Sequence, residues 1–388
     1  MRSPRLVAWL VVLAVLSAGG YAVTPYARAL SLIVRAANMG GSVEAFANDR
    51  ARAVTIDPAR TIPTRHGDVR ARMYRPDGSF PRTVLLVPGI HAMGIDEPRL
   101  TALAKDLAGS GVGAMTMALP DLQRYEITPR ATDQIEDAVA WLAGRRDLAA
   151  DGRVGLIGIS FAGGMSIVAA GRPSIRDRVA FVLSFGGHGD LPRVVHYLCT
   201  GEAPSYENAG IRPPHDYGVA VVLYGMAHLV VPPEQVEPLR DGIGTFLWGS
   251  QLTLVDQAQA DATFAKAREM AKALPPPAST YLTYVNDRNV TALGPVLVPH
   301  IAVVASDKEI SPERAPASPV APVYLLHGAD DTVIPSVESL LLRDHLERQG
   351  ADVRVLLSGL ITHAEVDQSA AASETWKLVS FWAEVLQQ

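Results

Sequence analysis

The fold of this chain follows from one stretch, Val154-Gly155-Leu156-Ile157-Gly158-Ile159-Ser160-Phe161-Ala162-Gly163-Gly164. Its first six residues are apolar or glycine, which predicts a short, fully buried strand in a parallel sheet. Residues 163–170 predict a helix. A strand that turns into a helix this quickly needs small side chains, because the two backbones nearly touch. The stretch therefore predicts a strand, a sharp turn that carries a serine, and a helix.

Strands and helices alternate on both sides of this stretch. Apolar or alternating runs predict strands at residues 53–56, 69–74, 83–87, 112–117, 179–184, 323–326 and 353–357. Helices are expected at residues 98–107, 132–145, 336–348 and 372–388. The period of two in residues 69–74 is typical of a half-exposed antiparallel strand at a sheet edge. The series predicts an α/β fold with a mostly parallel sheet and helices on both faces.

Regular alternation is interrupted between residues 190 and 318. Because the sheet pattern is incomplete before this block and resumes after it, we interpret the block as a largely helical lid inserted into one domain. The core then comprises residues 51–189 and 319–388. Residues 257–273 predict a helix, residues 219–223 suit a helix or a strand, and the Pro/Ala-rich residues 311–319 predict a hinge. Aromatic side chains of the lid could line an acyl pocket or form the lid's own core: Tyr197, Tyr206, Tyr217, Tyr224, Phe246 and Trp248.

Composition limits the classes of function. Hydrophobic residues make up 48% of the chain and charged residues 19%, so a large core can form. The net charge of −5 and the absence of long basic runs argue against nucleic acid as a partner. The single cysteine, Cys199, excludes an intramolecular disulfide and is interpreted as a small apolar side chain.

The N-terminus resembles an export signal. Arg2 and Arg5 precede an uncharged stretch, and residues 1–27 fit a signal-anchor or a cleaved signal peptide. Either interpretation predicts an exported chain: a catalytic domain outside the cytoplasm on a single anchor in the cell membrane, or a secreted protein. Residues 28–50 are expected to form a membrane-proximal helix, with an ordinary docking helix as the alternative.

Three polar elements follow predicted strands. Ser160 lies where a nucleophile elbow places its serine, although Ala162 replaces the usual last glycine of G-x-S-x-G. The stretch His327-Gly328-Ala329-Asp330-Asp331-Thr332-Val333-Ile334-Pro335 brings carboxylates to the end of a strand, and His363 follows the last strand. A serine, an acid and a histidine in this order suit a nucleophile, an orienting carboxylate and a general base.

These motifs resemble the α/β-hydrolase superfamily, in particular its dienelactone-hydrolase and prolyl-oligopeptidase-like branch. The resemblance covers the chain from about residue 83 to the C-terminus, apart from the lid. It implies Ser160 as nucleophile, Asp331 rather than Asp330 as acid, and His363 as base, with Asp190 as a rival acid. It also implies an oxyanion hole made by the backbone N–H groups of Ile90 and Phe161. Pro88 cannot contribute because proline has no N–H.

Four further residues at strand ends are candidates for lining the pocket: His91, Asp121, His188 and Asp190. The histidines show no metal-binding spacing, so neither a metal nor a cofactor is expected. The resemblance implies hydrolysis of a small-molecule ester or thioester through an acyl-serine. Peptidase activity, acyl transfer and a non-catalytic, membrane-tethered binding protein remain as alternatives.

Overall fold

A computed structural model describes residues 23–38, 40–207, 210–253, 255–361 and 372–388. It contains one eight-stranded sheet in the order β1-β2-β4-β3-β5-β6-β7-β8. The strands are β1 (Val54–Ile62), β2 (Val69–Pro76), β3 (Thr83–Val87), β4 (Gly113–Met117), β5 (Val154–Ile159), β6 (Val179–Phe185), β7 (Val323–Gly328) and β8 (Val353–Ser358). β2 is antiparallel to β1 and β4, and all later pairs are parallel. This is the α/β-hydrolase arrangement, which confirms the predicted fold class.

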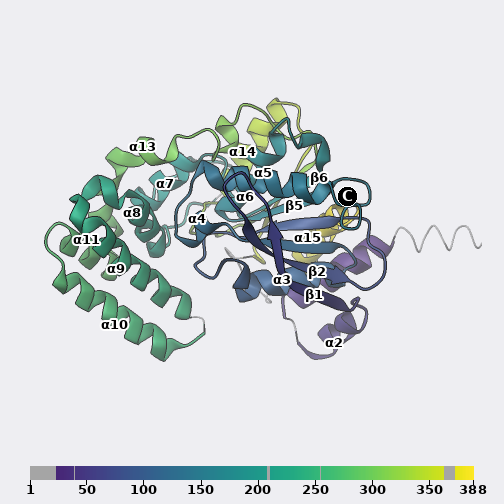
Figure 1. The fold of residues 1–388 in the computed structure, drawn as a ribbon, viewed down its shortest axis with the longest axis horizontal. Coiled ribbons are helices and arrows are strands. Elements are labelled where there is room, and N and C mark those ends of the chain that lie inside the picture. Colours follow the sequence, from purple (N-terminus) through teal and green to yellow (C-terminus); the bar gives the residue numbers. More distant parts are fainter. Residues whose placement is uncertain (1–22, 39, 208–209, 254, 362–371) are drawn as a thin grey trace, which may run out of the picture.

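Helices cover both faces of the sheet (Figure 1). In β3 every residue is buried, and alternate residues face opposite sides. Leu85 packs in a core with α5 (Pro129–Ala143), α6 (Phe161–Gly171) and α14 (Val337–Arg348). Leu86 packs in a second core with α3 (Pro98–Gly109) and α15 (Ala372–Val385). Burial on both faces explains why these strands are short apolar runs.

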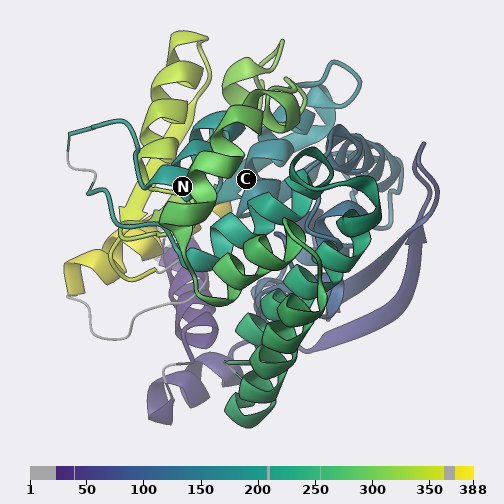
Figure 2. The same cartoon turned by 90° about the vertical axis from the view of Figure 1, so that its left-hand side faces the viewer.

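The described residues of the inserted block form mainly helices joined by loops. Its helices are α7 (Leu191–Thr200), α8 (Asp216–Val230), α9 (Pro233–Leu252), α10 (Gln257–Ala273), α11 (Ala278–Asn286), α12 (Val290–Leu297) and α13 (Ile301–Ala305). Helices α8 to α11 form a lobe beside the sheet, which faces the viewer in Figure 2. Residues 219–223, whose pattern suited a helix or a strand, lie in α8.

Three elements differ from the sequence prediction. β2 is antiparallel, as expected, but it lies between β1 and β4 rather than at the sheet edge, which β1 occupies. β1 runs from Val54 to Ile62 rather than over residues 53–56. Its pairing with β2 shifts register between Asp57 and Arg60. Pro58 lies inside this break, where an edge strand tolerates a residue without an N–H. The break hides the strand from an alternation pattern. A short helix, α4 (Pro120–Gln123), also follows β4.

The first described residues, 23–36, form a helix that packs against the domain. Leu32 and Ile33 join the core of α3 and α15. The buried Arg35 guanidinium lies 2.9 Å from the Asp106 carboxylate on α3. A second helix, α2 (Gly41–Asp49), follows, so residues 28–50 contribute two helices. The predicted leader, residues 1–27, lies almost entirely outside the described residues. Among the helices that are described, none combines the length and apolarity needed to cross a membrane.

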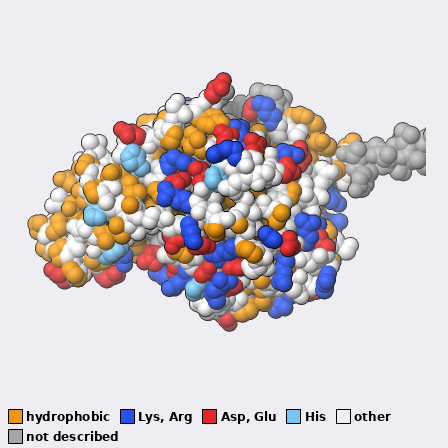
Figure 3. All heavy atoms as spheres, turned by 90° about the horizontal axis from the view of Figure 1, so that it is seen from above, with side chains coloured by type: hydrophobic (Ala, Val, Ile, Leu, Met, Phe, Trp, Pro, Cys, Tyr) orange, Lys and Arg blue, Asp and Glu red, His pale blue; other side chains and the backbone are white. Residues whose placement is uncertain are grey.

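The surface is mixed in charge. On the face shown in Figure 3, basic and acidic side chains alternate over the main body, whereas apolar side chains are frequent on the lobe formed by the inserted block. This distribution matches the mild net charge of −5.

Candidate active site

Ser160 is the N-cap residue of α6 and has a left-handed backbone conformation, with φ of 54° and ψ of −133°. A non-glycine residue in this region carries strain of about 1–3 kcal/mol, which persists only where the surroundings enforce it. Here the Ser160 N–H donates to the Phe185 carbonyl (2.8 Å), and the Ser160 carbonyl accepts from the Gly163 N–H (2.7 Å). The turn therefore holds the serine at the carboxyl end of β5, as a nucleophile elbow does.

The glycines around Ser160 are required by close backbone contacts. A Cβ on Gly158 would lie 2.4 Å from the Ala162 carbonyl oxygen. A Cβ on Gly163 would lie 2.3 Å from Ser184 Oγ on β6. Ala162 itself is fully buried. The tight position after the serine is thus Gly163, which explains why alanine is accepted at 162.

The loop after β3 lies directly against the serine. A Cβ on Gly89 would be 3.1 Å from Ser160 Cβ. Ile90 follows Gly89, and within the described chain its N–H donates no hydrogen bond. Phe161 begins α6, where first-turn N–H groups have no partner inside the helix. Both predicted oxyanion-hole donors therefore belong to segments that meet at Ser160, and their role stays a prediction.

Asp331 is buried at the end of β7, with 3% of its surface exposed. Its Oδ1 accepts hydrogen bonds from the Val333 N–H (2.8 Å) and the Ile334 N–H (3.1 Å). Its Oδ2 lies 3.4 Å from Nε2 of the buried His327. Donors of this kind stabilise a carboxylate and fix its orientation. Asp331 therefore has the burial and support that an orienting acid needs.

The neighbouring Asp330 is exposed instead. Its carboxylate forms an ion pair with Arg212, at 2.8 Å, in the segment before α8. The same segment also contacts the loop that carries Asp331, which we call the acid loop: the His215 N–H donates a hydrogen bond to the Thr332 carbonyl (2.7 Å). Tyr197 on α7 also donates to the Thr332 carbonyl, at 3.3 Å. The lid is thus attached to the loop that carries Asp331, an attachment that no local sequence pattern signals.

His363 lies outside the described residues, so its position relative to Ser160 stays a prediction. The chain that leads to it is described up to Ile361. At the carboxyl ends of the strands Ser358 pairs with Gly328, and the Ala329 N–H donates to the Ser358 carbonyl (3.0 Å). The last described residues before His363 therefore lie beside the start of the Asp331 loop.

Three of the pocket candidates, His91, Asp121 and Asp190, form hydrogen bonds or ion pairs with protein groups. His91 accepts from the Met93 N–H (3.2 Å) inside the loop after β3. The carboxylate of the buried Asp121 accepts from Arg124 (2.7 Å) and Thr128. The Asp190 carboxylate caps α7 by accepting from the Arg193 N–H (3.0 Å) and pairs with Arg314 (2.6 Å). These contacts give Asp121 and Asp190 a supporting role in the loops at strand ends.

His188, the fourth pocket candidate, is completely buried. Its Nε2 lies 2.7 Å from the Ile310 carbonyl oxygen and donates to it. Its ring packs against Phe161, with 5.7 Å between ring centroids. Burial lowers the pKa of His188 to about 4, so the imidazole is neutral at pH 7. His188 therefore supports the residue after the nucleophile from within the core.

Tyr217, one of the aromatic side chains expected to line an acyl pocket or to form the lid's own core, lies at the start of α8. Burial, and after it the negative charge of Asp331, raise the pKa of Tyr217 to about 12. The phenol is therefore neutral at pH 7, and the charge of Asp331 contributes to this shift.

No cluster of three or more histidine, cysteine or acidic side chains suited to a metal ion occurs among the described residues.

The sequence matches no family model and no curated protein. The structure resembles an esterase from Pyrobaculum calidifontis, with a TM-score of 0.49 and 17% identity over 93% of this chain and 90% of that one. An esterase from Pseudomonas putida ECU1011 gives a TM-score of 0.46 and 14% identity over 93% and 97%. An acylaminoacyl peptidase gives 0.47 and 12% over 87% and 42%. The fold assignment rests on the order and direction of the strands.

The contacts at the elbow predict the effect of adding one methyl group. We expect Gly158→Ala to lower the free energy of unfolding by about 1–3 kcal/mol, because the new Cβ would collide with the backbone of α6. Gly225→Ala in α8 is the matched control, since a Cβ there meets nothing within 4 Å, and it should be neutral or stabilising. Urea denaturation followed by circular dichroism measures both. Equal stability of the two variants would contradict the proposed contact.

Proposed function

We propose that the protein is a serine hydrolase that cleaves an ester or thioester through an acyl intermediate on Ser160. The observation that carries the proposal is the strained Ser160, buried to 93% at the edge of the sheet where Asp331 also lies. Strained backbone at a strand end is a pattern expected of a functional residue rather than of a plain turn.

The proposed reaction assigns one role to each residue. Ser160 Oγ adds to the carbonyl carbon, and its proton passes to the His363 imidazole. The N–H groups of Ile90 and Phe161 donate to the oxyanion that forms. His363 then protonates the leaving alcohol or thiol as the bond to it breaks, and a water molecule activated by His363 releases the acyl group as an acid. Asp331 orients the imidazole and stabilises its charged form.

The choice of Asp331 follows from its surroundings. Its Oδ1 accepts from two backbone N–H groups, which fix the orientation of the carboxylate, and we assign Oδ2 to the base. Asp330 is exposed and paired with Arg212, so desolvation does not strengthen its interactions. The two adjacent carboxylates therefore provide an internal comparison.

This comparison tests the proposal. We expect a fluorophosphonate probe to label the wild-type protein at Ser160 and to fail on Ser160→Ala. Asp331→Asn should reduce kcat for p-nitrophenyl butyrate by about 10⁴-fold, because an amide favours the wrong tautomer of the base. Asp330→Asn should stay within about threefold of wild type, as for a surface ion pair. Labelling that survives Ser160→Ala, or equal losses in the two aspartate variants, would refute the assignment.

We also propose that the N-terminal segment tethers the enzyme to a membrane, with the catalytic domain exported. The sequence supports this through Arg2, Arg5 and the uncharged stretch that follows. A further support is the surface that follows this stretch. Of the twelve exposed large hydrophobic side chains in the described chain, six lie on helix 23–36, on α2 or on α15. We call these six the N-terminal apolar patch: Val23, Tyr26, Leu30, Val43, Phe46 and Trp376.

The patch has the composition of a membrane interface. Tyr26 stacks on Trp376, with ring centroids 5.5 Å apart and planes 7° from parallel. Trp376 and Phe46 are each 59% exposed, and the Arg50 guanidinium lies over the Phe46 ring. Tyrosine and tryptophan concentrate at the headgroup level of bilayers, where an apolar ring and a polar edge are both accommodated. The patch therefore suits contact with lipid beside the tether.

Site-specific labelling of the full chain tests whether the N-terminal apolar patch faces the membrane. Phe46→Cys and the control Val303→Cys, which is 68% exposed on α13, are labelled with an environment-sensitive fluorophore and reconstituted into lipid vesicles. Burial raises the pKa of the native Cys199 thiol to about 12, so it stays largely unreactive. We expect nitroxide-labelled lipids to quench the probe at 46 and spare the probe at 303. Equal quenching at both positions would contradict the proposed orientation.

A further inference from the structure

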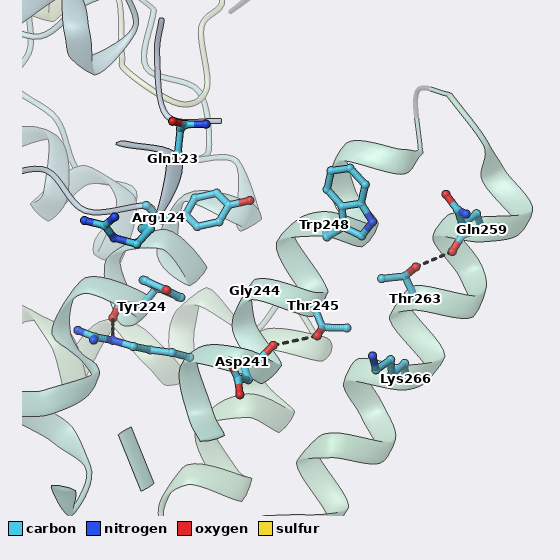
Figure 4. A pocket seen from close by; sticks show the side chains of 12 residues that line it. Gln123, Arg124, Tyr224, Asp241, Gly244, Thr245, Trp248, Gln259, Thr263 and Lys266 are labelled. Atoms are coloured by element: carbon cyan, nitrogen blue, oxygen red, sulfur yellow. Dashed lines mark hydrogen bonds between the residues drawn. The ribbon is translucent and has the colours of Figure 1, made fainter. Parts of the chain in front are cut away.

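A groove separates α4 from the lid helices α8, α9 and α10, with a volume of about 600 Å³ (Figure 4). This volume lies within the range of about 300–1,000 Å³ that is typical of small-molecule sites. Gln123 and Tyr125 line one side of the groove, and Tyr224 on α8 lies next to them. Gly244 and Trp248 on α9 line it as well, and α10 closes the far side.

Three aromatic side chains take part in the lining, beside polar and charged ones: Tyr125, Tyr224 and Trp248. Tyr125 and Tyr224 meet edge to face, with ring centroids 5.7 Å apart. Trp248 is 39% exposed and has no aromatic partner among the described residues. Tyr125 also has a left-handed backbone, with φ of 60°, and its hydroxyl accepts from Gln251 Nε2 (3.1 Å) on α9. A strained non-glycine residue fixed to the lid points to a role beyond that of a plain loop.

The charges of the groove are balanced. Arg124 is paired with Asp121 at 2.7 Å, and Arg240 with Glu237 at 3.2 Å. Arg240 also lies over the Tyr224 ring, at 5.4 Å from its centroid. The remaining charged side chains of the lining, Asp241 and Lys266, have opposite signs. The groove therefore offers flat surfaces without a net charge that would select an ionic ligand.

The groove borders the loop that lies on the nucleophile. Gln123 donates to the Ala92 carbonyl (3.4 Å), and its amide fills the space beside Gly94. These residues belong to the loop whose Gly89 contacts Ser160. The groove therefore borders the loop that lies against Ser160.

We propose that this groove binds a planar, uncharged aromatic group of the ester substrate while the ester carbonyl reaches Ser160. The inference rests on the proposed function, because it assigns the part of the substrate that does not react. Edge and face contacts with Tyr125, Tyr224 and Trp248 favour an aromatic ring over an aliphatic chain of similar size.

Gly244 provides the test, because a Cβ on it meets nothing within 4 Å and a larger side chain would fill the groove. The substrates are 1-naphthyl acetate and ethyl acetate, which share an acetyl group and differ in the ring. We expect Gly244→Leu to lower the ratio of their kcat/KM values by about tenfold or more, through the KM for the aromatic ester. Gly225→Leu, also in open space but outside the groove, should preserve the ratio and the fold.

Trp248→Ala should lower the same ratio by removing an aromatic contact instead of filling space. An unchanged ratio in both groove variants, or an equal fall in Gly225→Leu, overturns the inference even if Ser160 is the nucleophile. Calorimetric titration of Ser160→Ala with 1-naphthyl acetate separates the two proposals. Binding that Gly244→Leu abolishes supports the groove whether or not the wild-type protein turns over esters, and absence of binding overturns it.

Discussion

The rest of the structure depends on one close contact, the approach of β5 and α6 at Ser160. Gly158 allows β5 to approach the α6 backbone to a distance that no Cβ would permit, and Gly163 likewise allows α6 to approach Ser184 on β6. The contact forces Ser160 into a left-handed conformation at the edge where the parallel strands end. The loop after β3 then fits against the serine through Gly89. The position of Ser160 at the edge of the sheet therefore depends on the order of the strands, on the buried packing of both faces and on the small residues of the turn.

The lid is joined to this edge by buried polar contacts rather than by apolar packing alone. Glu338 is fully buried on α14, just after the acid loop, and accepts from the N–H groups of Gly189 (2.9 Å) and Asp190 (3.1 Å). Arg193 on α7 pairs with it at 2.5 Å. Because an unpaired buried charge is costly, these contacts hold the loop after β6, the first lid helix and the acid loop in one arrangement. The inserted block is thus joined to the segment that follows the Asp331 loop.

The sequence predicted the features that depend on local pattern. The strands from β2 to β8, the start of β1 and the turn at Ser160 follow from runs of apolar and small residues, and the acid loop follows from its motif. The rest of β1, beyond its register shift, does not. Features formed between distant segments were not predictable. The ion pair of Asp190 with Arg314, the attachment of Arg212 to Asp330, and the groove beside Tyr125 join residues far apart in the chain that no spacing rule connects. Polar residues at strand ends were expected to line a pocket. Instead, Asp121 pairs with the nearby Arg124, and Asp190 pairs with a partner that only the fold brings near.

The most direct test of this account is a crystal structure of the full chain after reaction with a phosphonate ester. We expect phosphorus bonded to Ser160 Oγ, its oxygen between the N–H groups of Ile90 and Phe161, and the His363 imidazole about 3 Å from Ser160 Oγ. An adduct on another residue, or an imidazole of His363 far outside hydrogen-bonding distance of Ser160, would contradict it.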